Sequence, residues 1–298
     1  MSFIVMEDLV NLLSKFIRLV AIRLPDDVYN ALKELSSKEN SCWGKEVYSI
    51  MFDNIKLALE KNVPVCQDTG VLMFFVDAGA DFPYLNVLPD AIHAATIRAT
   101  EEAPLRPNVV EPFTEKNTGN NVGTRLPWIE WNILPNTSYS NITLYLAGGG
   151  TSLTGQAKVL PPASGFKGVI EFVLEVISSY GLNACPPFLV GVGLGTTVET
   201  AAILSKRALL RPIGSRNPDP NAASLEKILY DKINGLEIGP QGLGGSTTAL
   251  AVHVEYSARH PATLAVGVST GCWAHRRGTM RLKSDLSYEL PSYEGVEL

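Results

Sequence analysis

The first sixty residues place apolar side chains at the spacing of amphipathic helices, and helices are predicted across residues 1–61. One is expected from Asp26 to Leu35, begun by two acidic residues, and another from Lys45 to Glu60. Charged side chains interrupt every apolar run between Phe3 and Leu24. That segment is therefore predicted to be an amphipathic helix rather than a signal peptide or a membrane anchor.

Farther along the chain, short apolar runs alternate with helical patterns. Strands are predicted over Val71–Val76, Trp128–Leu134, Asn141–Leu146 and Leu189–Val192, and helices over Pro89–Glu102, Gly168–Tyr180, Thr197–Leu209 and Ala222–Asn234. Glycine-rich turns are expected at residues 148–150 and 239–245, and an irregular tail from Ser284. The alternation indicates a mixed α/β (α+β) fold, with residues 1–298 forming one domain of two lobes and the glycine turns converging on a central cleft.

Composition narrows the class of protein. Of the 298 residues, 46% are hydrophobic and 18% charged, which is typical of a globular chain. The formal net charge of −5 argues against nucleic-acid binding, since the longest notable basic run is Arg276-Arg277. Four cysteines are too few for a disulfide-dense secreted protein of this length, so a reducing cytoplasm is expected.

Three of the cysteines lie in turn-like segments rich in glycine, proline or small polar residues: Cys66, Cys185 and Cys272. They are too far apart for a local zinc motif. A free cysteine is commonly a small buried hydrophobe, and Cys42 is assigned to that class. For the other three, the setting favours ligation. Three thiolates can hold a cubane iron–sulfur cluster and leave its fourth iron open to a substrate hydroxyl.

Polar residues near these turns have competing interpretations. Asp68, two positions after Cys66, could serve as a general acid or base, or could simply cap the turn at Gly70. Arg98 and Arg106 could each bind a carboxylate through the guanidinium fork, although a surface role is favoured for Arg98.

The segment Gly191–Gly195 has three glycines but misses the spacing of a dinucleotide-binding loop. Its glycines are instead expected to let the backbone approach a cluster or a substrate. His253, His260 and His275 each have the core or surface histidine as the default interpretation, and His275 is notable because it follows Cys272 by three positions.

Six segments resemble, in order, the alpha subunit or N-terminal domain of the iron–sulfur class I fumarases and L(+)-tartrate dehydratases. They are VPVCQDTG (63–70), LRPNVVEPFTEKNTGNN (105–121), GGGTSLTGQAKVL (148–160), ACPPFLVGVGLG (184–195), IGPQGLGGSTTAL (238–250) and RHPATLAVGVSTGCWAHRR (259–277). Together they cover most of the chain.

The resemblance implies a site of eight residues. A [4Fe-4S] cluster would be held by Cys66, Cys185 and Cys272, the substrate by Gln67, Arg106 and Gly149, and catalytic roles would fall to Asp68 and His260. The fourth iron would bind the hydroxyl and a carboxylate of a 2-hydroxy dicarboxylic acid.

The chain departs from the family pattern in two substrate-side loops. Ala147 replaces a lysine, Thr151–Leu153 replaces a polar and acidic continuation, and Asn120 stands where aspartate is usual. Because the cysteine turns are kept, the chemistry is expected to persist with a shifted substrate. The leading expectation is reversible hydration of the fumarate/malate type. The alternatives are dehydration of L(+)-tartrate to oxaloacetate and, in a different class, a non-catalytic iron–sulfur or zinc protein.

The resemblance also implies a partner. The family's remaining active-site groups lie on a swivelling domain for which this sequence has no counterpart. A separately encoded beta subunit, an oxygen-sensitive enzyme and a hetero-oligomer such as α2β2 are therefore expected.

Overall fold

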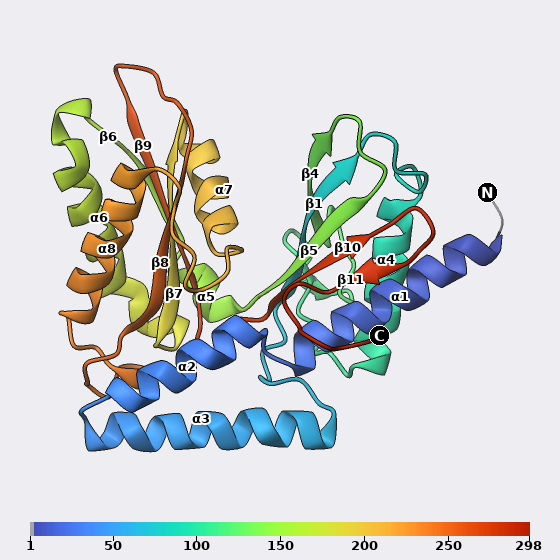
Figure 1. Ribbon diagram of the computed structural model, residues 1–298, viewed down its shortest axis with the longest axis horizontal. Coiled ribbons are helices and arrows are strands. Elements are labelled where there is room, and N and C mark those ends of the chain that lie inside the picture. Colours follow the sequence, from blue (N-terminus) through green and yellow to red (C-terminus); the bar gives the residue numbers. More distant parts are fainter. Residues whose placement is uncertain (1–2) are drawn as a thin grey trace. The chain divides into compact units, whose positions relative to one another are not determined.

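The computed structural model describes residues 3–298, which divide into two compact units (Figure 1). Unit 1 contains the chain up to Asp26, residues 54–148 and residues 276–298. Unit 2 contains residues 27–53 and 149–275. Within the described residues, no helix is long and apolar enough to span a membrane.

The helices and strands of the two units follow one another along the chain with short 3-10 turns between some of them. The helices are α1 (Phe3–Ile22), α2 (Asp26–Lys38), α3 (Cys42–Lys61), α4 (Leu88–Glu102), α5 (Gly149–Leu153), α6 (Gly165–Tyr180), α7 (Val198–Ala208), α8 (Pro220–Asn234), η1 (Pro162–Ser164), η2 (Gly181–Ala184) and η3 (Pro240–Gly242). The strands are β1 (Val71–Gly79), β2 (Val110–Glu111), β3 (Lys116–Asn117), β4 (Trp128–Leu134), β5 (Ser140–Ala147), β6 (Gln156–Leu160), β7 (Phe188–Gly195), β8 (Ala249–Tyr256), β9 (Leu264–Gly271), β10 (Arg277–Leu282) and β11 (Tyr288–Glu289).

Unit 1 is built on a five-stranded sheet in the order β11-β10-β5-β1-β4, with β1 parallel to β4 and antiparallel to β5. Alternate residues of β1, such as Leu72, Phe74 and Val76, are buried in one core with apolar residues of α1 and α4. This period of two is what a strand requires when it buries one face against helices. Residues 110–117 add the small β2-β3 ribbon, which is a separate sheet.

Unit 2 is built on a four-stranded sheet in the order β6-β9-β7-β8. Strand β7 runs parallel to β8 and antiparallel to β9. Helices α6 and α8 cover one face, where their apolar residues share a core with Phe188, Val190 and Val192 of β7, and α7 covers the other (Figure 1).

The three glycines of β7 face α7. A Cβ on Gly191 would lie 2.1 Å from the carbonyl oxygen of Ser205, and one on Gly193 would lie 2.0 Å from that of Ala201. The glycines therefore let the α7 backbone pack against the strand. The expectation that they let the backbone approach a cluster or substrate is wrong, because the space is filled by a helix.

Most predicted elements are present within a few residues, and the mixed α/β class is confirmed. Residues 1 and 2, included in the predicted helical region, lie outside the described part. The expected turn at 148–150 instead opens α5 at Gly149, and Gly181 keeps a helical φ of −58° and continues into η2. Strand β9 was not predicted. All eight of its residues are buried, so the alternation of apolar and polar residues that indicates a half-buried strand is missing.

The close approach of α7 to β7 can be tested with Gly193→Ala. The added methyl group has to displace helix backbone, and overpacking of this kind costs about 1–3 kcal/mol of unfolding free energy or more. Gly235→Ala is the matched control, because Gly235 has a helical φ of −66° and a Cβ there would come no closer than 3.3 Å to a neighbouring atom. Chemical denaturation should show a large loss for the first variant and almost none for the second. Equal losses would contradict this account of the β7 glycines.

Candidate functional site

Cys185 and Cys272 lie at the same end of the unit 2 sheet. Cys185 precedes β7 by three residues and Cys272 directly follows β9. The two strands are antiparallel, and Leu189 pairs with Gly271. The backbone N–H of Trp273 donates to the carbonyl oxygen of Cys185 at 3.2 Å. Sheet pairing thus brings together two cysteines that are far apart in sequence.

The glycine turn that holds Gly149 lies beside the Cys185 segment. Gly149 is exposed at the start of α5, and a Cβ on the next residue, Gly150, would meet the carbonyl oxygen of Asn183 at 2.2 Å. Only glycine allows this approach. The hydroxyl of Thr270, two residues before Cys272, donates to the carbonyl oxygen of Thr151 at 3.4 Å. The predicted substrate turn therefore contacts the chain segments next to both cysteines of unit 2.

A third glycine-rich segment supports Cys185 from another side. We call residues 238–248 the buttress loop. Gln241 donates its backbone N–H, at 2.8 Å, and its side-chain amide, at 3.3 Å, to the carbonyl oxygen of Pro186. Gly242 packs against Leu182, where a Cβ would come within 2.4 Å of a side-chain methyl carbon. No role was predicted for this loop, although its sequence is one of the six family segments.

Cys66, Gln67 and Asp68 form a turn in unit 1. The Cys66 thiol lies 3.7 Å from Oε1 of Gln67. Oδ1 of Asp68 accepts the backbone N–H of Gly70 at 3.0 Å, so the turn-capping interpretation of Asp68 is confirmed. The same oxygen accepts Nδ2 of Asn108 at 3.4 Å. An acid/base role for Asp68 stays a prediction, and the cap fixes where its carboxylate lies.

Arg106 is fastened to this turn through its backbone. Its N–H donates to Oγ1 of Thr69 at 3.0 Å, and its carbonyl oxygen accepts Nδ2 of Asn121 at 3.1 Å. Arg106 as a whole is exposed to solvent. Such an arrangement holds the backbone rigidly and presents a cation to solvent, which suits a carboxylate-binding arginine.

Two asparagines hold the Asp68 turn and the Arg106 segment together, and neither was predicted to matter. Asn108 reaches Asp68, and its side chain also donates to the carbonyl oxygen of Gly70 at 3.2 Å. Asn121 is 1% exposed, has φ of +61° and accepts the Asn108 N–H at 2.8 Å. The signal was available, since both lie in the family segment 105–121 and asparagine tolerates positive φ better than most residues.

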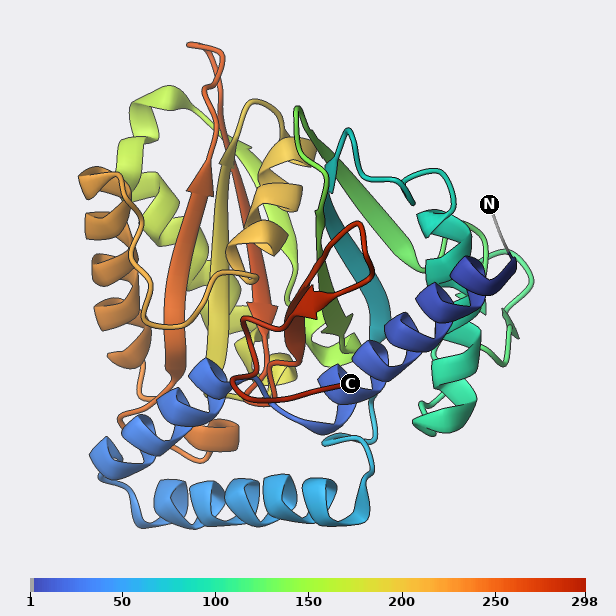
Figure 2. The same cartoon turned by 45° about the vertical axis from the view of Figure 1, so that its right-hand side comes forward.

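His260 is placed differently from the other predicted residues of unit 2. It lies in the exposed loop between β8 and β9, which projects beyond the sheet at the end opposite to Cys185 and Cys272 (Figure 2). Eight residues of β9 separate this loop from Cys272, which corresponds to roughly 25 Å. Its Nδ1 accepts the N–H of Ala262 at 3.1 Å. Unit 2 therefore does not bring His260 to its two cysteines.

Four residues for which a core or surface role was favoured are His275, His253, Arg98 and Cys42. His275 is buried, with Nε2 2.9 Å from the carbonyl oxygen of Leu209, and His253 is buried with Nδ1 near the carbonyl oxygen of Ala208. Arg98 forms an ion pair with Glu7 at 2.9 Å. Cys42, expected to be buried, is exposed at the start of α3, so that expectation is wrong.

None of the four cysteines forms a disulfide: Cys66 and Cys272 are partly exposed, and Cys185 is exposed like Cys42. Among residues 3–298, no group of three or more His, Cys, Asp or Glu side chains is arranged to hold a metal ion. Unit 2 places the thiols of Cys185 and Cys272 at one end of its sheet, and unit 1 holds the thiol of Cys66 in its turn.

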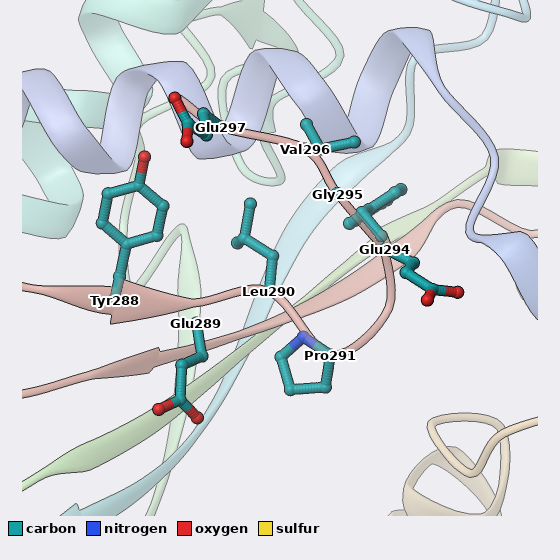
Figure 3. A pocket seen from close by; sticks show the side chains of 9 residues that line it. Tyr288, Glu289, Leu290, Pro291, Glu294, Gly295, Val296 and Glu297 are labelled. Carbon is teal, nitrogen blue, oxygen red and sulfur yellow. The ribbon is translucent and has the colours of Figure 1, made fainter.

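A pocket of about 630 Å³ in unit 1 is unrelated to these residues (Figure 3). It is lined only by residues 288–297 of the C-terminal segment. Its charged side chains are Glu289, Glu294 and Glu297, with no lysine or arginine. An acidic lining repels carboxylates, so this pocket is unsuited to a dicarboxylate.

The fumarate hydratase (Fumerase) family profile matches residues 10–281. The chain belongs to the iron–sulfur class I fumarase family. It is therefore a hydro-lyase subunit, as members of this family are.

Named relatives within the class I fumarase family refine the comparison. The L(+)-tartrate dehydratase subunit alpha of Escherichia coli strain UTI89 is 52% identical over 281 residues, covering 94% of this chain and 93% of the relative. That of strain K12 is 51% identical with the same coverage. A Methanocaldococcus jannaschii relative is 43% identical over 273 residues, covering 90% and 95% of the two chains. These relatives favour the tartrate alternative over the leading fumarate/malate expectation.

Proposed function

We propose that this chain is the alpha subunit of an L(+)-tartrate dehydratase, which converts L(+)-tartrate into oxaloacetate and water. The observation that carries the choice of substrate is the 52% identity to such a subunit along nearly the whole of both chains. The departures at Ala147, Asn120 and Thr151–Leu153 agree with a substrate other than the fumarate/malate pair, because Ala147 and Thr151–Leu153 flank or follow Gly149 closely in sequence and Asn120 lies in the same family segment as Arg106.

We further propose that Cys66, Cys185 and Cys272 hold a [4Fe-4S] cluster. The chemistry of the donors fits: none of the three cysteines is in a disulfide, all three are at least partly exposed, and thiolates are the usual ligands of such clusters. Cys185 has φ of +53° and is followed by two prolines, so the backbone around it is tightly fixed. A fixed backbone suits a ligand that has to keep one geometry.

Arg276 supports an anionic group in its neighbourhood. It is 2% exposed, and its Nε and Nη1 have no hydrogen-bond partner among the described residues. A buried cation with unmatched donors is costly unless an anion accompanies it. Arg276 follows Cys272 by four positions, and an iron–sulfur cluster held by thiolates carries negative charge.

The other predicted residues have roles that follow from their placement. When bound, the cluster supplies a Lewis-acidic iron that polarises the substrate hydroxyl. Arg106 pairs with a substrate carboxylate, and Gln67 donates a hydrogen bond through its exposed side-chain amide. Gly149 leaves room for the substrate to approach the backbone. His260 is given no step, since unit 2 keeps it away from Cys185 and Cys272.

Asp68 is proposed to move the proton. Dehydration removes a proton from one hydroxyl-bearing carbon and hydroxide from the other, and the enol that results rearranges to oxaloacetate. The Asp68 carboxylate accepts the carbon-bound proton, while its hydrogen bonds from Gly70 and Asn108 hold it in place. The departing hydroxide takes up a proton from solvent and leaves as water, and Asp68 then returns its proton to solvent, so atoms and charges balance.

We also propose a separate beta subunit, in an assembly such as α2β2. The support is that relatives covered over more than nine-tenths of their length are named as alpha subunits. A single alpha chain is then expected to bind its cluster and turn over little substrate.

The first test is of substrate and class. The chain, purified without oxygen together with a beta subunit encoded beside it, is expected to form oxaloacetate from L(+)-tartrate much faster than it interconverts fumarate and malate. Coupled reduction of the oxaloacetate measures the rate. Activity should disappear after exposure to air, because an iron with an open coordination site is easily oxidised. A preference for malate would instead identify the enzyme as a fumarase.

Ligation is tested by Cys185→Ser with Cys42→Ser as its matched control. Both residues are exposed cysteines of unit 2, but only Cys185 is a proposed ligand. After anaerobic reconstitution, the Cys185 variant should lose most iron and sulfide and all tartrate turnover. The control should match the unmodified protein in both. Full iron content in Cys185→Ser would refute the ligand assignment.

The role of Asp68 is tested by Asp68→Asn, which removes the proton acceptor and keeps the shape. It should lower kcat about 10²–10⁴-fold with iron content unchanged. Asn108→Ala, which removes one hydrogen bond to the carboxylate and another to the Gly70 carbonyl oxygen, should lower kcat by about 10–100-fold. Asp77→Asn is the control, since Asp77 also accepts a hydrogen bond from an asparagine, Asn132, but has no proposed role. A normal kcat in Asp68→Asn would rule out its role in proton transfer.

A further inference from the structure

Glu39 is a buried carboxylate that no sequence pattern indicated. It follows the last residue of α2 and is 2% exposed. Gly44 and Gly245 make room for it: a Cβ on Gly44 would lie 2.7 Å from Cγ of Glu39, and one on Gly245 would lie 2.5 Å from Oε1. Two glycines from distant segments therefore line one acidic side chain.

The Glu39 carboxylate accepts five hydrogen bonds, all from neutral donors. Two come from the N–H groups of Asn40 and Ser41, at 2.9 and 2.8 Å, at the entry to α3. Three come from the buttress loop: the N–H of Ser246 at 3.1 Å, the N–H of Thr247 at 3.0 Å and the Thr247 hydroxyl. The hydroxyl of Tyr48 in turn donates to Oγ1 of Thr247 at 2.8 Å.

No cation is paired with this carboxylate in the described structure; its charge is balanced by these dipoles. Burial by itself raises the pKa of Glu39, but the hydrogen bonds from the Thr247 hydroxyl and from backbone N–H groups outweigh it, so the pKa lies below its ordinary value. The ionised form is therefore the one that the surroundings stabilise. A buried ionised group is costly unless such donors stay in place, which makes the arrangement rigid.

The buttress loop transmits this rigidity to Cys185. Next to the residues that Glu39 holds, Oδ1 of Asn234 accepts the N–H groups of Thr248 and Ala249 at 2.8 and 3.1 Å. The beginning of the loop is joined to the same place, because the N–H of Gly239 donates to Oγ1 of Thr248 at 3.2 Å. Between Gly239 and Ser246, Gln241 binds Pro186, the residue after Cys185. Glu39 is thus two contacts away from a proposed cluster ligand, and every step lies within unit 2.

We propose that Glu39 is a positioning residue for Cys185: it holds the buttress loop, and the loop holds the Cys185 thiol where the cluster needs it. The inference rests on the proposed function for its cluster, but the placement of Cys185 can be measured without one. The two ends of the loop meet where Gly239 donates to Thr248, beside the residues that Glu39 holds, and its middle contacts Leu182 and Pro186 on either side of Cys185 in sequence. A residue needed only for stability would not require that connection.

The test compares Glu39→Gln with two controls. The glutamine keeps the size of the side chain but replaces one acceptor oxygen with a donor, which opposes the N–H groups it has to receive. Glu34→Gln removes an exposed carboxylate of α2 that pairs only with Lys38. Val169→Ala, a substitution on α6 in the core of unit 2, lowers stability and leaves the groups that hydrogen-bond to Glu39 unchanged. It separates general destabilisation from loss of positioning.

Two readouts are used. In metal-free protein, mass spectrometry gives the rates at which iodoacetamide alkylates Cys185 and Cys66, a partly exposed cysteine that lies in unit 1, whereas Glu39 belongs to unit 2. In reconstituted protein, the loss of cluster absorbance under an iron chelator is followed without oxygen. In Glu39→Gln, alkylation of Cys185 should become about tenfold faster relative to Cys66, because the loop opens locally. Cluster loss should be about 10–100-fold faster. Both controls should stay close to the unmodified protein.

The outcomes are separable. If the unmodified protein holds a cluster and Glu39→Gln behaves like Val169→Ala in both readouts, the inference is overturned while the proposed function stands. If the unmodified protein binds no cluster, the proposed function fails, but the alkylation rates still decide whether Glu39 positions Cys185. A change confined to Cys185 then supports positioning by Glu39, and an unchanged rate overturns it.

Discussion

Antiparallel pairing of β7 with β9 is the constraint on which the candidate site depends. The register that sets Leu189 opposite Gly271 also sets Cys185 and Cys272 at one end of the sheet. In a strand the side-chain period is two, so a slip of β7 by one residue would turn Gly191 and Gly193 away from α7 and place larger side chains where the helix backbone lies. The register is therefore fixed by the core against α6, α8 and α7, and the positions of the two thiols follow from it.

The sequence predicted the fold best where one face of an element is buried. The amphipathic helices were found within three residues of their observed ends, because their periodicity is visible in the apolar pattern, and the strands β4 and β5 were found within one residue. Strand β9 was missed because it is buried on both faces, and α5 because a run of three glycines normally opposes a helix. Pairing order was beyond prediction, since it depends on contacts between distant segments.

For the site, the residues that carry chemistry were easier to predict than those that hold them. Cys66, Asp68 and Arg106 were apparent from their residue types and from the family pattern. Asn108, Asn121 and Glu39 were not, because an amide or a carboxylate gives no sign in sequence of the donors and acceptors it will meet. The glycines of β7 show the converse error: a pattern that suggested a ligand turned out to serve the packing of a helix.

Unit 1 is assembled from three separate stretches of the chain, and this has a consequence for biosynthesis. Strand β5 is flanked by β1, which is made before residues 149–275 of unit 2, and by β10, which is made only after them. During translation the sheet of unit 1 therefore lacks β10 and β11 while residues 149–275 are being produced. Cofactor insertion into such a chain belongs to a late stage, after the last interior strand has joined, and a nascent polypeptide stalled before that point would expose the unpaired edge of β5 to other chains.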